Sequence, residues 1–109
     1  MTQQTTLVLQ PKRRGFHLIT GEICSQLPAL PACGLLHLFI QHTSAALSLN
    51  ENADPDVQTD LKCAFNHLVR EREPYYTHTC EGDDDMPAHI KSTLIGASIT
   101  IPISNHRLN

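Results

Sequence analysis

The sequence Gly34-Leu-Leu-His-Leu-Phe-Ile-Gln-His-Thr-Ser-Ala-Ala-Leu-Ser-Leu-Asn50 carries the strongest β-strand pattern of the chain. Its first half is almost wholly apolar, and its second half alternates apolar and polar residues, which is typical of a strand with one buried face. We expect either one long strand with a bulge near Thr43-Ser44 or two strands. Leu36 and Ile40 share one face. An unbroken strand would place His42 on that same, buried face.

Four further segments are predicted to be strands by the same criterion. Residues 5–10 and 15–19 flank a turn at 11–14 and are expected to form a hairpin. Residues 75–80 and 98–103 are the other two, and the last of these alternates isoleucines with small polar residues.

Three helices are expected between these strands. Thr20 can cap a short helix that contains Glu22 in its first turn. Asp54-Pro55 opens the clearest helix, whose apolar residues recur at helical spacing and are expected to lie on the sheet. A third helix follows Met86-Pro87 and ends at Gly96.

Length and composition restrict the class of protein. The 109 residues suffice for one compact domain, and a net charge of −3 gives no sign of a nucleic-acid surface. The sequence contains no run of eighteen apolar residues, so no membrane span is expected. The N-terminus lacks the pattern of a secretory signal. The four cysteines have no zinc-motif spacing, so we interpret them as reduced thiols of a cytoplasmic protein.

The segment His78–Lys91 has the densest set of reactive side chains. It contains four acids, two histidines and a lysine within fourteen residues. Such a cluster near a helix start offers metal ligands, proton-transfer groups and a cation for an anionic substrate. The alternative is a solvated acidic loop that caps the helix, and the residue pattern alone leaves the two interpretations evenly balanced.

Two other segments contain polar side chains that could bind a metal ion or a polar substrate. Gln41-His42-Thr43-Ser44 offers a histidine among hydroxyl groups, as a metal ligand, a general base or a hydrogen-bonded core histidine. Asn50–Asp56 is typical of an ordinary strand-to-helix loop, although its asparagines would also suit a polar substrate.

These segments, in this order, resemble the YjbQ-like family over nearly the whole chain. The resemblance rests on five runs of residues: Arg14-Gly15-Phe16-His17, Gly34 to Ala45 with its Gln-His-Thr-Ser, Asn50-Glu51-Asn52 with Asp54-Pro55, Glu81-Gly82 followed by Asp84 to Ser92, and the expected strand from Gly96 to Ile103.

The resemblance implies a single α/β domain of α+β type spanning residues 1–109. It implies a mainly antiparallel, curved β-sheet or sandwich with two to three helices on one side, assembled as a homotrimer. Members are commonly described as secondary thiamine-phosphate synthase enzymes, which weakly join a pyrimidine pyrophosphate to a thiazole phosphate. The substrate implied is therefore a small phosphorylated compound, and a divalent metal, Zn or Mg, would neutralise the pyrophosphate leaving group.

Carried over to this chain, the resemblance places the polar positions of the site at His42, Thr43, Ser44, Asn52, Asp84, His89 and Lys91. The role of each position, and the addition of Arg107 as an anion contact, are our own inference. The expected catalytic residues are His42, His89 and Lys91, and the expected metal ligands are His42, Asp84 and His89. The expected substrate-binding residues are Thr43, Ser44, Asn52 and Arg107.

The chain departs from the family at its C-terminal end. Members usually continue with a Gly-Thr-Trp-Gln-Gly strand and a Glu-His-Arg segment, so we expect this chain to be truncated relative to them. His106 stands where a glycine is usual, and a turn with positive φ there would be strained. Three hypotheses follow: a thiamine-phosphate synthase-like enzyme, a metal- or phosphate-binding module without turnover, and an inactive truncated member.

Overall fold

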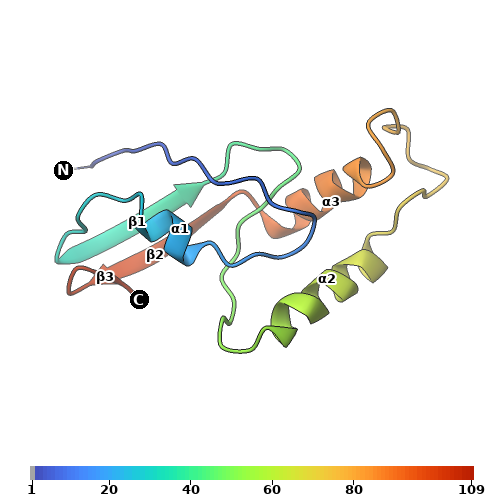
Figure 1. Cartoon of the computed structure of the whole chain (residues 1–109). Coiled ribbons are helices and arrows are strands. Elements are labelled where there is room, and N and C mark those ends of the chain that lie inside the picture. The colour runs from blue at the N-terminus through green and yellow to red at the C-terminus, as the bar shows by residue number, and fades with distance from the viewer. Residues whose placement is uncertain (1) are drawn as a thin grey trace.

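The computed structural model describes residues 2–109. It contains the helices α1 (Thr20–Cys24), α2 (Asp56–Leu68) and α3 (Asp85–Ile95), and the strands β1 (Cys33–Phe39), β2 (Ser98–Ser104) and β3 (Arg107–Leu108). The strands form one antiparallel sheet in the order β1-β2-β3 (Figure 1). The chain is therefore a small α+β domain, as expected, with one sheet and no second layer of strands among the described residues.

The sheet is built on alternation, and its two faces differ. Leu36 of β1 pairs with Ile101 of β2, and this face also carries Ile103, which is only 5% exposed. The opposite face carries Leu35 and Phe39, which are 71% and 63% exposed. The predicted orientation of β1 is thus correct, and one face of the sheet is open.

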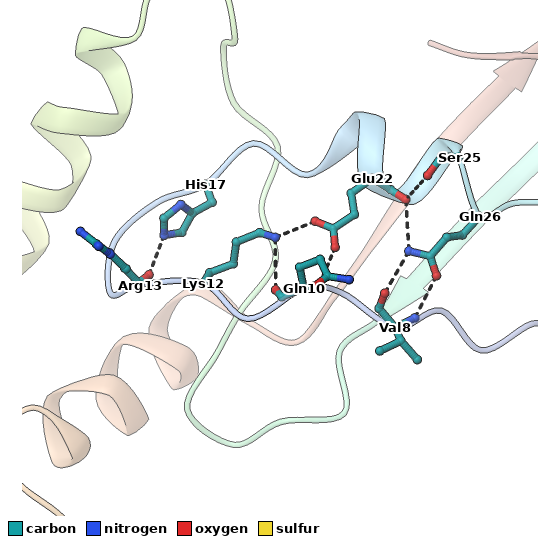
Figure 2. A network of polar contacts seen from close by, with 8 residues as sticks. All are labelled: Val8, Gln10, Lys12, Arg13, His17, Glu22, Ser25 and Gln26. Atoms are coloured by element: carbon teal, nitrogen blue, oxygen red, sulfur yellow. Dashed lines mark hydrogen bonds and ion pairs between the residues drawn. The ribbon is translucent and has the colours of Figure 1, made fainter.

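The N-terminal segment is fastened to α1 by side chains (Figure 2). The Gln26 amide donates to the carbonyl oxygen of Val8 and accepts from its N–H, at 3.0 and 3.1 Å. Glu22 accepts from the ammonium group of Lys12 at 2.7 Å and from the N–H of Gln10 at 2.5 Å. Gln26 thus supplies Val8 with the pair of bonds that a neighbouring strand would otherwise provide.

Helices α2 and α3 lie beyond the end of the sheet (Figure 1). The Asp54 carboxylate accepts from the N–H of Asp56 at 2.9 Å, the bond expected of a capping residue at the start of α2. The apolar face of α2 lines a hollow together with Phe16, Leu49 and Ile95. The expectation that this helix packs on the sheet is therefore wrong, because its partners are loops and α3.

Several predicted strands are absent from the described residues. Segments 5–10 and 15–19 do not form a hairpin, and 75–80 is a loop. β1 ends at Phe39, so residues 41–50 are not strand either, and His42 is exposed rather than buried. These segments do alternate apolar and polar residues. They are not strands because the described chain offers them no neighbouring strand with which to form backbone hydrogen bonds.

The turn between β2 and β3 has the strain expected at His106. Asn105 and His106 have φ angles of 52° and 62°, in the left-handed region. A ring nitrogen of His106 contacts the carbonyl oxygen of Leu30 at 2.9 Å. This contact offsets part of the cost of a non-glycine residue in that conformation.

Among the described residues, no helix has the length and apolar character that crossing a membrane requires.

Candidate functional site

Three ligand-type side chains meet at the start of α3: His78, Asp85 and His89. The Nε2 atom of His78 lies 2.6 Å from Oδ2 of Asp85, and the Nε2 atom of His89 lies 3.1 Å from the same oxygen. One donor atom from each of the three lies within 4.8 Å of the others. The carboxylate therefore sits between two imidazoles.

Local structure explains this convergence. α3 begins at Asp85, two residues earlier than the sequence predicted, so Asp85 and His89 stand four residues apart on one face of the helix. His78 comes from the preceding loop, which is held by the Tyr76 hydroxyl donating to the carbonyl oxygen of Arg70 at 2.7 Å. The two imidazole rings pack edge to face, with centroids 5.2 Å apart.

A backbone contact orients His89. Its Nδ1 atom lies 2.9 Å from the carbonyl oxygen of Thr43, which can only accept a hydrogen bond. Nδ1 therefore carries a proton. Nε2, which faces the Asp85 carboxylate at 3.1 Å, is the nitrogen that a metal ion would bind in place of a proton. Ser92, one turn further along, donates to the carbonyl oxygen of Ala45 at 2.7 Å, so the same loop is held against α3 at two points.

The electrostatics of the cluster favour an ionised carboxylate. The hydrogen bond from His78 is the largest influence, and with the nearby His89 it lowers the pKa of Asp85 below its usual value, against a smaller opposing effect of burial. Asp85 is thus an anionic ligand at neutral pH. The side chains of Asp85, His89 and His78 are 21%, 30% and 45% exposed, so the cluster is accessible from solvent.

Two imidazoles and one carboxylate form a recognised metal-binding set. Three protein ligands leave at least one position for water or substrate, which distinguishes catalytic zinc sites from closed structural ones. Metal bonds of about 2.0–2.1 Å in a tetrahedral arrangement separate two donors by roughly 3.3 Å. Each Nε2–Oδ2 distance would therefore have to lengthen by less than about 1 Å, and the two imidazole donors, which lie within 4.8 Å of each other, would have to approach by up to about 1.5 Å.

His42 does not belong to this cluster in the described structure. Its Nδ1 atom accepts a hydrogen bond from the N–H of Ser44 at 3.0 Å, and the Ser44 hydroxyl lies 3.2 Å away. A neutral His42 that accepts at Nδ1 carries its proton on Nε2, which leaves no lone pair there for a metal. Thr43 contributes its carbonyl oxygen to the site, by orienting His89.

The other expected ligand and the expected substrate contacts lie elsewhere. Asp84 is the residue before α3 and is not part of the cluster, so Asp85 takes its place in the metal hypothesis. Asn52 is exposed in the loop before α2, and Arg107 is exposed on β3. The structure does not bring either of them into the three-residue cluster.

Lys91 lies on α3 but makes different contacts. Its ammonium group donates to Oδ1 of Asn66 on α2 at 2.7 Å, and the same oxygen accepts from Arg14 at 2.9 Å. Burial lowers the pKa of Lys91 below its usual value, the positive charge of Arg14 lowers it further, and Glu71 partly opposes both. Lys91 thus belongs to a second polar cluster, between α2 and α3.

Two members of the three-residue cluster, His78 and Asp85, were not among the site residues predicted from the sequence. The i,i+4 spacing of Asp85 and His89 would have identified the carboxylate if the helix start had been set at Asp85 rather than after Met86. No periodicity marks His78, because the loop between residues 78 and 85 returns it to α3. Its only signal was membership of the dense segment His78–Lys91.

Comparison with known proteins agrees with the fold and the motifs. Residues 4–109 match the family model described as UPF0047 protein YjbQ-like. The chain belongs to this family. It is 49% identical over 110 residues to the UPF0047 protein YjbQ of Escherichia coli O157:H7, covering 99% of this chain and 79% of that protein. A UPF0047 protein of Synechocystis is 56% identical over 75 residues, which cover 69% of this chain and 51% of the relative.

Solved structures of similar proteins have the same fold. A conserved hypothetical protein from Thermus thermophilus superposes with a TM-score of 0.74 at 34% identity, covering 87% of this chain and 71% of that one. A hypothetical protein from Aeropyrum pernix gives a TM-score of 0.74 at 30% identity, covering 93% of this chain and 75% of that one. The names of these YjbQ-like relatives state no activity.

Proposed function

We propose that this YjbQ-like chain binds a divalent transition-metal ion through His78, Asp85 and His89. The observation that carries the proposal is the convergence of three donor atoms within 4.8 Å, with a backbone carbonyl orienting one of the imidazoles. An imidazole-rich set favours zinc or a similar ion over Mg²⁺, which prefers oxygen ligands and keeps several waters.

The substrate class follows from the family resemblance. The proposed reaction joins a pyrimidine pyrophosphate to a thiazole phosphate with release of pyrophosphate, as in thiamine-phosphate formation. A bound divalent ion would supply Lewis-acid stabilisation of the negative charge on the pyrophosphate oxygens. Asp85 would bind the metal ion as an ionised carboxylate. The Thr43 carbonyl would keep the proton of His89 on Nδ1, so that Nε2 faces the metal ion.

A binding module without turnover is the second candidate. None of the three cluster residues lines the hollow beside α2 or a second hollow beside α1, which Ile23 and Leu47 line. A catalytic site that excludes water needs such walls. The open position of the cluster on a single chain therefore favours either binding alone or completion of the site by another subunit.

The exposed surface supports the proposal that the chain assembles with further copies, while the homotrimeric state itself rests on the family resemblance alone. A compact monomer of 12.1 kDa exposes about 6,000 Å², whereas this chain exposes 8275 Å². Its radius of gyration is 16.1 Å, against about 13 Å for a compact domain of this length. The excess of about 2,200 Å² is as large as a stable subunit interface buries.

The experiment measures pyrophosphate release from the two phosphorylated substrates with one equivalent of zinc. The wild-type chain, His89→Ala and the control His67→Ala are compared, because His67 is an exposed histidine of α2 outside the cluster. The proposal predicts activity in the wild type and in the control, and loss of activity in His89→Ala. Equal rates in all three would remove the cluster from the reaction, and zinc binding without product would select the binding module.

A further inference from the structure

The polar cluster between α2 and α3 has a surplus of positive charge. It contains three cations, Arg14, Arg72 and Lys91, but only two carboxylates, Glu71 and Asp83, and both carboxylates pair with the arginines. Arg14 and Arg72 share Glu71, and Arg72 also contacts Asp83 at 3.1 Å. Among the described residues, Lys91 has no carboxylate within ion-pair distance, and its partner is the neutral amide of Asn66.

Lys91 is half-buried, which makes this arrangement costly. A cation that is partly withdrawn from water loses hydration, and a charged partner normally offsets the loss. A second cation, Arg14, lies on the other side of the Asn66 oxygen. The free chain therefore holds two like charges close together around one neutral acceptor.

Asn66 Oδ1 marks where an anionic oxygen would fit. It accepts from Lys91 at 2.7 Å and from Arg14 at 2.9 Å, so the two cationic nitrogens are no more than about 5.6 Å apart. Charge-assisted hydrogen bonds to an anionic oxygen have lengths of about 2.7–2.9 Å. One oxygen of a phosphate group can thus bridge the same two nitrogens when the Asn66 side chain rotates aside and gives up this position.

Donors for such a group remain available. A guanidinium group has five N–H donors and an ammonium group has three. In the described contacts Arg14 uses two donors, to Glu71 and Asn66, and Lys91 uses one. The remaining donors can satisfy several oxygens of a tetrahedral anion.

The loop that carries Arg14 is held in place from both sides. Upstream, Lys12 is fixed to Glu22, and the Nε2 atom of His17 contacts the carbonyl oxygen of Arg13 at 2.6 Å (Figure 2). Downstream, Phe16 packs on Phe65 of α2 with ring centroids 5.4 Å apart. Arg14 therefore reaches α2 from a constrained loop, as expected for a preorganised binding residue.

We propose that Arg14 and Lys91, arranged around Asn66, form an oxyanion-binding site for the phosphate group of a small ligand. The site is distinct from the His78–Asp85–His89 cluster: along a helix of 3.6 residues per turn, residue 91 points about 160° away from residue 89. The proposal therefore stands without the metal proposal.

The test measures the thermal stability of the chain as inorganic phosphate is added, in EDTA and at constant ionic strength. EDTA removes metal, so a shift cannot come from phosphate bound to a metal ion. Phosphate is expected to raise the Tm of the wild type and of Arg107→Gln, which removes an exposed cation of β3 outside the site. Lys91→Gln and Arg14→Gln are expected to weaken phosphate binding at least tenfold.

A fourth variant keeps the test decisive if the others fold poorly. Asn66→Asp places a carboxylate where the amide oxygen now lies and supplies the missing negative charge internally. It is expected to have a higher Tm than the wild type in the absence of phosphate and no response to phosphate. The proposal is overturned if the wild type does not respond, if Lys91→Gln responds like the wild type, or if Asn66→Asp is destabilised.

Discussion

Zinc is expected to raise the thermal stability of this chain, and His89→Ala is expected to remove most of that gain. A ligand that binds only the folded state stabilises it by about 2.7 kcal/mol at a concentration of 100 Kd. An unfolding entropy of about 2.1 cal/mol/K per residue gives roughly 230 cal/mol/K for 109 residues. The Tm of the wild type should therefore rise by about 12 °C.

Removing His89 leaves two of three donors. Loss of an outer-shell partner already weakens metal binding by about 10–100-fold, so we take about 100-fold as the least effect of losing a ligand. At the same zinc concentration the variant would then gain about 0.4 kcal/mol, or roughly 2 °C.

Scanning calorimetry with and without zinc measures both shifts. His67→Ala is the control, since it retains the cluster and all four exposed cysteines. A shift in His89→Ala as large as in the wild type would refute the reasoning.

Four further predictions follow from named contacts. Zinc affinity measured by titration calorimetry should be weaker at pH 5 than at pH 7, because protons compete with the metal ion for its imidazole and carboxylate ligands; an unchanged affinity at pH 5 would point to other ligands. Lys12 lowers the pKa of Glu22 chiefly by hydrogen bonding, so Glu22 stabilises the fold above its unfolded pKa of about 4.3 and loses that contribution as the pH falls through its lower folded pKa. Urea unfolding of Glu22→Gln and the wild type should accordingly differ at pH 7 and converge near pH 2. At the β2–β3 turn, His106→Gly should be more stable to urea than His106→Ala by about 0.5–1 kcal/mol, because only glycine relieves the positive φ; the reverse order would contradict the strain. Ile103→Ala should cost about 2–4 kcal/mol by urea unfolding and Leu35→Ala less than about 0.5, since Ile103 is 5% exposed and Leu35 71%; equal costs would mean that Leu35 is covered, as in an oligomer.

The elements predicted best are those specified by local pattern. The alternation of β1 and β2 and the helical spacing of α2 identified these elements and their faces, because period and burial are linked directly. The hairpin predicted from 5–10 and 15–19 failed for a non-local reason. Val8 finds its hydrogen-bond partners in the side chain of Gln26, eighteen residues away, and no pattern near Val8 signals that.

The sequence predicted the segment that carries the site correctly, but it predicted only some of the site's residues. His89 was named from the sequence, but the carboxylate beside it is Asp85, since the helix starts at that residue. Any of the three consecutive aspartates could have been the metal-binding carboxylate. The start of α3 at Asp85 places that residue, and not the other two, one turn from His89. His42 was expected as a ligand, but its Nδ1 bonds to Ser44, a local contact that competes with metal binding in this conformation.

The most direct test of the metal site is X-ray absorption at the zinc edge on the chain loaded with one equivalent of zinc. Two imidazoles and one carboxylate predict only nitrogen and oxygen neighbours at about 2.0–2.2 Å, with the outer-shell scattering of two histidines. In His89→Ala the signal of one imidazole should disappear. A sulfur shell at about 2.3 Å, supplied by exposed thiols such as Cys80, or an unchanged spectrum in His89→Ala would contradict the assignment of His78, Asp85 and His89.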